Sequence, residues 1–357
     1  NYGLNLATGE YLVIFDAEDR PEPDQLKYAY LAFEKYGNKI ACFQATLNYY
    51  NANHNLLTKF FTAEYSLWFD LILTGLQSLG TTIPLGGTSN HFKVATLKKL
   101  QGWDPFNVTE DCDLGIRLFK QGYQTAIIDS YTLEEANSNL VNWLRQRSRW
   151  IKGYIQTFLV HSRDFPTFVK DHKAHSFIFQ LIIGGKIAFI FINPFMWALT
   201  FAYFAARSQV GPTIEQFFPS VIFYMAVFCL VAGNFLYLYY YMIALVKLSK
   251  FELIKYVFLV PIYWFAVSIA ATIAAYQLIV KPHFWEKTVH GFHLAKHPEA
   301  SKGETYTPTR IPAIGRWQVA NLKELISSGT AAGGILIAAT LIANFANFIY
   351  NAYLIRT

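Results

Sequence analysis

The stretch Tyr11-Leu-Val-Ile-Phe15-Asp16-Ala17-Glu18-Asp19 joins a short apolar run to three carboxylates. An apolar run of this length is typical of a buried strand. Ligands of open α/β sheets bind beyond the carboxyl ends of the strands, so these acids stand where a ligand is expected. Oxygen ligands two residues apart suit Mg²⁺ or Mn²⁺, which predicts a metal site at Asp16 and Glu18, or at Asp19 in place of Glu18. The alternative is a solvated acidic turn.

A second acidic segment reads Val108-Thr109-Glu110-Asp111-Cys112-Asp113. Thr109 is expected to cap the N-terminus of a helix, and Gly122 fits the end of that helix. Asp111 and Asp113 would then lie in the first turn, where the helix dipole favours negative charge. The dipole explains both acids by itself. The functional alternative is a general base held at the rim of a pocket.

A basic and aromatic segment reads Asn142-Trp-Leu-Arg-Gln-Arg-Ser-Arg-Trp150 and has helical character. Gln146, Arg149 and Trp150 stand at i, i+3 and i+4, so they share one helix face. The planar fork of arginine suits phosphate, and an indole offers a flat apolar platform for a sugar ring. The alternative is an anchor at the cytoplasmic edge of a membrane.

The composition narrows the class of protein. Of the 357 residues, 53% are hydrophobic and only 15% are charged, which excludes a disordered chain and argues against an ordinary soluble enzyme. The net charge of +6 is weak evidence for nucleic acid, because membrane proteins collect Lys and Arg at their cytoplasmic edges. Three widely spaced cysteines indicate neither a disulfide framework nor a zinc site.

The apolar residues are concentrated in the second half of the chain. We therefore expect a soluble-like α/β domain over 1–163 and a membrane domain over 164–357. A helix needs about 20 apolar residues to cross a bilayer. Uncharged stretches of that length occur at 187–206, 221–245 and 331–350.

The stretch 253–280 is also long and apolar, but it conflicts with the charge rule for membrane loops. The basic flank 145–186 places the first domain in the cytoplasm, and a third crossing would put the basic segment 281–329 outside. We expect 253–280, which Pro261 divides, to be interfacial or re-entrant, and 281–329 to be a cytoplasmic loop. The alternative is an ordinary spanning helix.

Together the three motifs resemble those of the processive, membrane-integrated family-2 glycosyltransferases, such as cellulose, chitin, hyaluronan and poly-N-acetylglucosamine synthases. Those enzymes carry D-x-D, T-E-D and Q-x-x-R-W in this order, followed by transmembrane helices. The counterparts here are Asp16-Ala17-Glu18, Thr109-Glu110-Asp111 and Gln146-Arg147-Ser148-Arg149-Trp150. The resemblance covers nearly the whole chain and implies a GT-A-like α/β fold followed by an α-helical transmembrane region.

The resemblance implies a role for each motif. Asp16 and Glu18 would hold Mg²⁺ or Mn²⁺, and Asp111 would deprotonate the acceptor hydroxyl. Arg149 would contact the donor diphosphate, and Trp150 would stack under the acceptor sugar. The further site residues that it implies are Glu110 beside the base, Thr109, Gln146 and Arg147 as substrate-binding residues, Gly86–Asn90 as a loose match to an acceptor-side loop, and Thr288 in a gating-like loop.

The implied function is inverting transfer from UDP-glucose or UDP-N-acetylglucosamine to a growing β-linked polysaccharide, coupled to export. The implied partners are the donor, the glycan acceptor, membrane lipid and an accessory export subunit, in an inner membrane. The alternatives are single-sugar transfer to a lipid and a non-catalytic transporter or scaffold. The sequence departs from the family at Glu18, where Asp is usual. Fifteen residues precede Asp16, so we expect part of the nucleotide-binding fold to lie outside this sequence.

Overall fold

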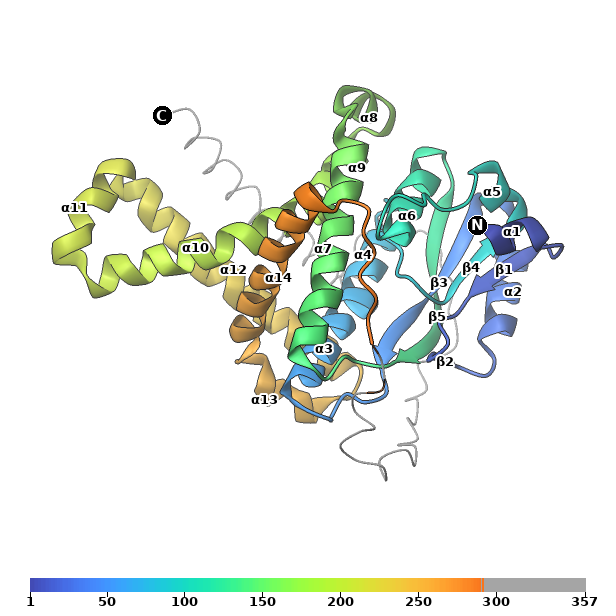
Figure 1. The fold of residues 1–357 in the computed structure, drawn as a ribbon, viewed down its shortest axis with the longest axis horizontal. Helices are drawn as coiled ribbons and strands as arrows, with labels where there is room; N and C mark the ends of the chain where they lie inside the picture. Colours follow the sequence, from blue (N-terminus) through green and yellow to red (C-terminus); the bar gives the residue numbers. More distant parts are fainter. Residues whose placement is uncertain (290, 292–357) are drawn as a thin grey trace, which may run out of the picture.

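The computed structural model describes residues 1–289 and 291. Figure 1 shows a sheet domain at one end of the molecule and a pair of long helices, joined at their tip, extending away from it. The helices between these two parts carry residues from both halves of the sequence. The expected stretch 331–350, and the loop 281–329 apart from 281–289 and 291, lie outside the described residues.

One mixed five-stranded sheet organises the first domain, with strand order β1-β4-β3-β5-β2. β3 and β5 pair in parallel, and the other pairs are antiparallel. The strand expected at 11–15 is present as β1. The strands are β1 (Tyr11–Ile14), β2 (Arg20–Pro21), β3 (Ile40–Tyr49), β4 (Asn90–Lys93) and β5 (Gln124–Glu134).

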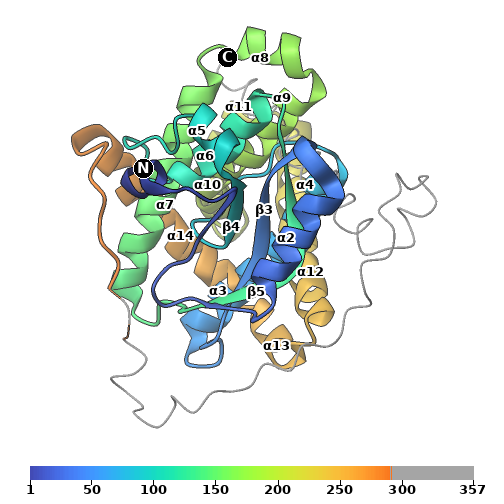
Figure 2. The same cartoon turned by 90° about the vertical axis from the view of Figure 1, so that its right-hand side faces the viewer.

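Helices cover both faces of the sheet. Successive residues of β3 point to opposite faces, so neighbouring side chains pack against different helices. Phe43 packs with Phe33 of α2 (Gln25–Tyr36), whose ring centroid lies 4.7 Å away. Cys42 belongs to a second core with Leu114 and Leu118 of α6 (Glu110–Lys120). Figure 2 views the sheet domain from the end opposite the long helices and shows α2 lying across β3.

The remaining elements of the first domain surround this sandwich. Thr109 is the N-cap residue of α6, as expected, although its side chain makes no capping hydrogen bond. A capping box between Asn55 and Thr58 starts α3. The elements are α1 (Tyr2–Leu6), η1 (Gly37–Lys39), α3 (Leu56–Leu67), η2 (Trp68–Ile72), α4 (Leu73–Ser78), α5 (Val94–Lys99) and α7 (Leu140–Ser162).

Within the part of the chain that the structure describes, three helices are long and apolar enough to cross a membrane: Ala174–Ala205, Val221–Lys247 and Val260–Val280. The first two contain the expected spans, and a buried amide pair joins them, with Asn234 Nδ2 donating to Asn193 Oδ1 at 3.1 Å. The elements here are α8 (Phe165–His172), α9 (Ala174–Phe179), η3 (Gln180–Gly184), α10 (Gly185–Ala205), α11 (Arg207–Phe217), α12 (Ser220–Lys247), η4 (Phe251–Leu253), α13 (Ile254–Val257) and α14 (Val260–Val280).

The stretch 253–280 is broken before Pro261, which lies in the first turn of α14, where a missing N–H costs nothing. α14 packs mainly against α7 of the first domain. Figure 1 shows α14 beside α7, whereas α10 and α12 extend away to α11. The length and composition of α14 are sufficient for it to cross a membrane, and its placement along the membrane surface stays a prediction.

Candidate active site

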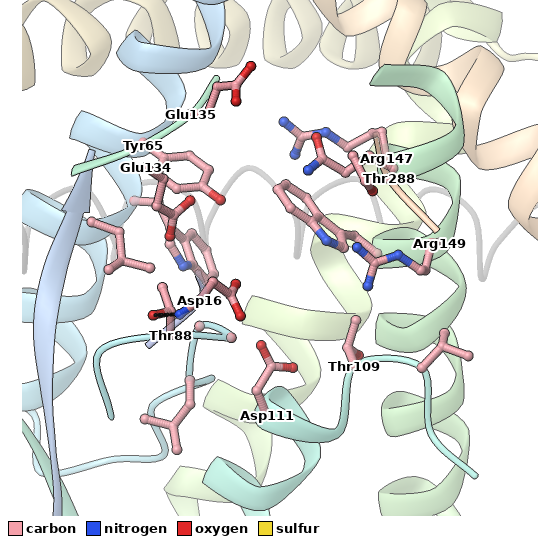
Figure 3. Close-up of a pocket in the computed structure, with 18 of the residues that line it drawn as sticks. Asp16, Tyr65, Thr88, Thr109, Asp111, Glu134, Glu135, Arg147, Arg149 and Thr288 are labelled. Carbon is pink, nitrogen blue, oxygen red and sulfur yellow. Dashed lines mark hydrogen bonds between the residues drawn. The ribbon is translucent and has the colours of Figure 1, made fainter. Parts of the chain in front are cut away.

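A pocket of about 380 Å³ lies between the strand ends of the sheet and α7. Every residue that the sequence singled out for chemistry lines it, although these residues come from four separate parts of the chain. Figure 3 shows Asp111 and Arg149 entering the pocket from different helices, with Asp16 on the sheet side. The predicted residues that line the pocket are Asp16, Glu18, Thr109, Glu110, Asp111, Gln146, Arg147, Arg149, Trp150 and Thr288.

The loop after β1 brings its carboxylates to the pocket through a local hydrogen-bond network. The Asp16 N–H donates to Asp19 Oδ2 at 2.8 Å, and the hydroxyl of Thr88 donates to the same oxygen. The Asp16 N–H also approaches Thr88 Oγ1 at 3.3 Å. Asp19 therefore shapes the loop, and Thr88, from the loosely matched segment Gly86–Asn90, is its partner.

The sequence argument missed two acids, Glu134 and Glu135, which line the same pocket. Burial raises the pKa of Glu134 well above its usual range, and the charges of Asp19, Asp16 and Glu18 raise it further. A usable signal was present, since β5 ends in acids just as β1 does. The pocket thus has an acidic wall, which we define as Asp16, Glu18, Asp19, Glu134 and Asp111.

Asp111 lies in the first turn of α6, and its Oδ1 accepts the Cys112 N–H at 2.7 Å. Burial, with a smaller contribution from Glu110, raises the pKa of Asp111 to about 7. The guanidinium of Arg149 opposes this shift. A carboxyl group with such a pKa can accept and return a proton near neutral pH, which suits general base chemistry.

Neighbouring residues hold α6 in place. Asp113 accepts hydrogen bonds from Arg117 Nε at 2.7 Å and from His161 of α7 at 2.8 Å. Gly153 allows α7 to lie close to the N-terminus of α6, because a Cβ atom at this position would lie 2.2 Å from Thr109 Oγ1. Asp113 thus has a structural role, and backbone proximity sets the spacing between α6 and α7.

The opposite side of the pocket is formed by α7. Burial lowers the pKa of Arg149, although the charges of Asp111, Glu110 and Asp16 oppose the effect. Buried polar atoms with no hydrogen-bond partner among the described residues include Gln146 Oε1, Arg149 Nε and Thr288 Oγ1. Buried polar groups normally have partners, so their lack of one here indicates a polar ligand.

The segment that follows α14 lies along one face of α7 and reaches the pocket. Lys152 Nζ donates to the Phe284 carbonyl at 2.6 Å, and the amide group of Asn142 exchanges hydrogen bonds of 2.6 and 3.2 Å with the backbone of Val289. Trp285 lies over the Arg149 guanidinium, with 4.7 Å from Cζ to the ring centroid. These contacts place Thr288 among the pocket residues, as the sequence predicted.

The carboxylates of the pocket fit a divalent cation that is also bound by ligands from outside the protein, such as substrate phosphates. Within residues 1–289 and 291, no three His, Cys, Asp or Glu side chains are grouped closely enough to hold a metal by themselves. Mg²⁺ is usually bound through one or two carboxylates together with substrate phosphates. The repulsion that raises the pKa of Glu134 is the kind that a cation relieves.

The fold and the pocket define a glycosyltransferase: a mixed sheet with carboxylates beyond its strand ends, an acid of raised pKa, a facing arginine, and helices apolar enough for a membrane. The comparison with known families agrees. A family model described as glycosyl transferase family group 2 matches residues 11–279. The chain belongs to this family.

Individual relatives are more distant. The chain is 24% identical to the probable glycosyltransferase YdaM of Bacillus subtilis (strain 168), over 60% of this chain and 56% of the relative. It is 28% identical to the probable glucomannan 4-beta-mannosyltransferase 10 of Arabidopsis thaliana, over 51% of this chain and 34% of the relative. It is 29% identical to glucomannan 4-beta-mannosyltransferase 2 of the same plant, over 51% and 35%. The matches thus span roughly a third to a half of these relatives' lengths.

Proposed function

We propose that this protein transfers a sugar from a nucleotide-sugar donor to a growing glycan chain, with inversion at the anomeric carbon. The observation that carries the proposal is the pairing of Asp111, with its pKa of about 7, and Arg149 in one pocket. A base and a phosphate-binding cation in one pocket are what transfer of a sugar from a diphosphate requires.

In the proposed reaction, Asp111 accepts the proton of an acceptor hydroxyl. The acceptor oxygen attacks the anomeric carbon from the face opposite the diphosphate, so one C–O bond forms as the bond to the leaving group breaks. Arg149 stabilises the charge that develops on the diphosphate, and Trp150 supports the acceptor sugar. When bound, Mg²⁺ or Mn²⁺ would be held by Asp16 together with Glu18 or Asp19, and would supply further positive charge.

The sugar is a separate part of the proposal. UDP-glucose and UDP-N-acetylglucosamine follow from the family resemblance. The plant relatives are named as mannosyltransferases of glucomannan, which supports GDP-mannose as a third candidate donor. A polysaccharide acceptor is favoured over a single lipid acceptor, because the resemblance to polysaccharide synthases includes the Gln146–Trp150 segment and the gating-like segment whose Trp285, Lys287 and Thr288 line the pocket.

The membrane arrangement is also proposed. With α10 and α12 as spans, the first domain lies on the cytoplasmic side of the membrane and α14 lies at its surface. The basic flank 145–186 supports this orientation. The growing chain would leave through the membrane region, with an accessory export subunit as a candidate partner.

The test is a turnover assay on the protein in membranes. UDP-glucose, UDP-N-acetylglucosamine and GDP-mannose, each radiolabelled, are supplied separately with Mn²⁺ or Mg²⁺, and the product is sized. Metal-dependent polymer from one donor is the expected result. One sugar on a lipid would replace the polymer proposal with the lipid-acceptor alternative, and no transfer from any of the three donors would contradict the proposal.

A further inference from the structure

Arg147 lines the pocket, and both of its Nη atoms are hydrogen-bonded within the protein, whereas its buried Nε has no hydrogen-bond partner among the described residues. Its Nη1 donates to Glu64 Oε1 at 3.0 Å, and its Nη2 donates to Glu64 Oε2 at 2.6 Å. Nη2 also donates to the Tyr263 hydroxyl at 2.6 Å, and that hydroxyl donates to Glu64 Oε2. These residues come from α3, α7 and α14, and we call them the Glu64–Arg147–Tyr263 cluster.

The charges of this cluster are compensated within it. Burial alone would raise the pKa of Glu64, but the charges of Arg147 and Lys186, together with the hydrogen bonds from Tyr263 and Arg147, outweigh burial and lower it. Arg147 is only 5% exposed. Binding a donor phosphate through the Nη atoms of Arg147 would require breaking a buried, bidentate ion pair with Glu64, and breaking such a pair is costly. Arg149, two residues further along the same helix, has no such pairing carboxylate within salt-bridge distance among the described residues.

Arg147 also lies within a cage of aromatic rings. Its guanidinium carbon is 4.7 Å from the ring centroid of Phe61, 5.0 Å from that of Trp150 and 5.4 Å from that of Trp143. The Trp150 ring lies 5.8 Å from that of Phe61. A cation at this distance from an indole attracts the ring and restricts it. Among the residues in contact with Arg147, Trp150 is the proposed acceptor platform.

We propose that the Glu64–Arg147–Tyr263 cluster positions Trp150, and through it the acceptor sugar, and takes no part in binding the donor. Arg147 is then a positioning residue, in contrast to the substrate-binding role that the family resemblance implies for it. Tyr263 connects α14 to the acceptor side of the pocket. The inference rests on the proposed transferase function and assigns its two substrates to different arginines of one helix.

The test uses Tyr263→Phe, which removes a single hydroxyl, and Arg147→Lys, which keeps the charge but loses the bidentate pairing. The protein is assayed in membranes with the donor that the wild type turns over and with mannopentaose, cellopentaose or chitopentaose, whichever it extends. We expect both variants to raise KM for the pentasaccharide roughly tenfold, the effect of losing one hydrogen bond to a charged group. KM for the donor and inhibition by the nucleoside diphosphate should change less than about twofold.

Tyr256→Phe is the matched control, because Tyr256 on the adjacent α13 accepts a hydrogen bond from Lys59 at 3.3 Å and does not line the pocket. It should leave both KM values unchanged. A rise in donor KM or weaker nucleoside diphosphate inhibition in Arg147→Lys would overturn the inference, and so would a loss of folded protein with unchanged KM values. Wild-type turnover is the separate check on the proposed function, so the two failures are distinguishable.

Discussion

The pKa values of buried carboxyl groups are shifted in opposite directions on the two sides of the pocket. On the acidic wall, burial and mutual repulsion raise the pKa values of Glu134 and Asp111. In the Glu64–Arg147–Tyr263 cluster, a carboxylate and a guanidinium compensate each other, and the pKa of Glu64 is lowered. The difference teaches that the pKa of a buried carboxyl group beside a pocket depends on whether cations or other carboxylates surround it. Each prediction below tests that contrast.

The largest effect is expected for Asp111→Asn, which removes the proposed base with little change in shape. The kcat value should fall by about 10²–10⁴-fold, the usual contribution of general base catalysis. Asp24→Asn, at an exposed position at the start of α2, is the control and should be neutral. Near wild-type turnover of Asp111→Asn would remove Asp111 from the mechanism.

Metal removal tests the acidic wall directly. A chelator should lower turnover by about 10²-fold or more, because a metal at a phosphate contributes several kcal/mol, and added Mn²⁺ or Mg²⁺ should restore it. Asp16→Asn should raise the metal concentration needed for half-maximal turnover. Full activity in the chelator would show that the acidic wall needs no cation.

Arg149→Met tests the other half of the contrast. Inhibition by the nucleoside diphosphate should weaken by about 10–100-fold, as expected for losing hydrogen bonds between a cation and phosphate. Arg145→Met on the same helix is the control, because Arg145 is exposed and its nearest carboxylate, that of Glu286, is 3.6 Å away. Equal effects of the two substitutions would mean that general positive charge, and not a specific contact, binds the donor.

The smallest effect concerns pH. Asp111 acts as a base only when ionised, so with a pKa of about 7 kcat should rise roughly tenfold between pH 6 and pH 8. The two sides should also differ in stability. A raised pKa in the folded state costs stability as pH rises toward 7, whereas the lowered pKa of Glu64 contributes stability that is lost as pH falls. Asp111→Asn should therefore raise Tm more at pH 8 than at pH 5. A flat kcat profile would contradict the assignment.

Local patterns predicted much of this structure. The apolar run before Asp16 became β1, Thr109 begins α6, and the face shared by Gln146, Arg149 and Trp150 lies on α7. The residues of these motifs are close in sequence, so periodicity and capping rules can detect them. That the three motifs meet in one site was predicted only from the family resemblance, because no single motif carries this information.

Long-range contacts were not predictable in the same way. The strand order depends on pairings such as that of β1 with β4, which are far apart in sequence. Glu64 and Tyr263 show no local pattern, because their partner Arg147 is distant in the chain. The sequence argument therefore grouped Arg147 with Arg149 as a substrate-binding residue, and only the position of Glu64 separates the two.

Gly153 has a consequence for comparing related chains. Because a Cβ atom there would overlap the side chain of Thr109, α7 can approach the start of α6 this closely only with glycine at the position. With Thr109 in its present position, a side chain at residue 153 would force the two helices apart and widen the gap between the acid of one and the arginine of the other. Residues 109 and 153 therefore constrain each other, and a larger residue at 153 requires a smaller one at 109 if the width of the pocket is to be kept.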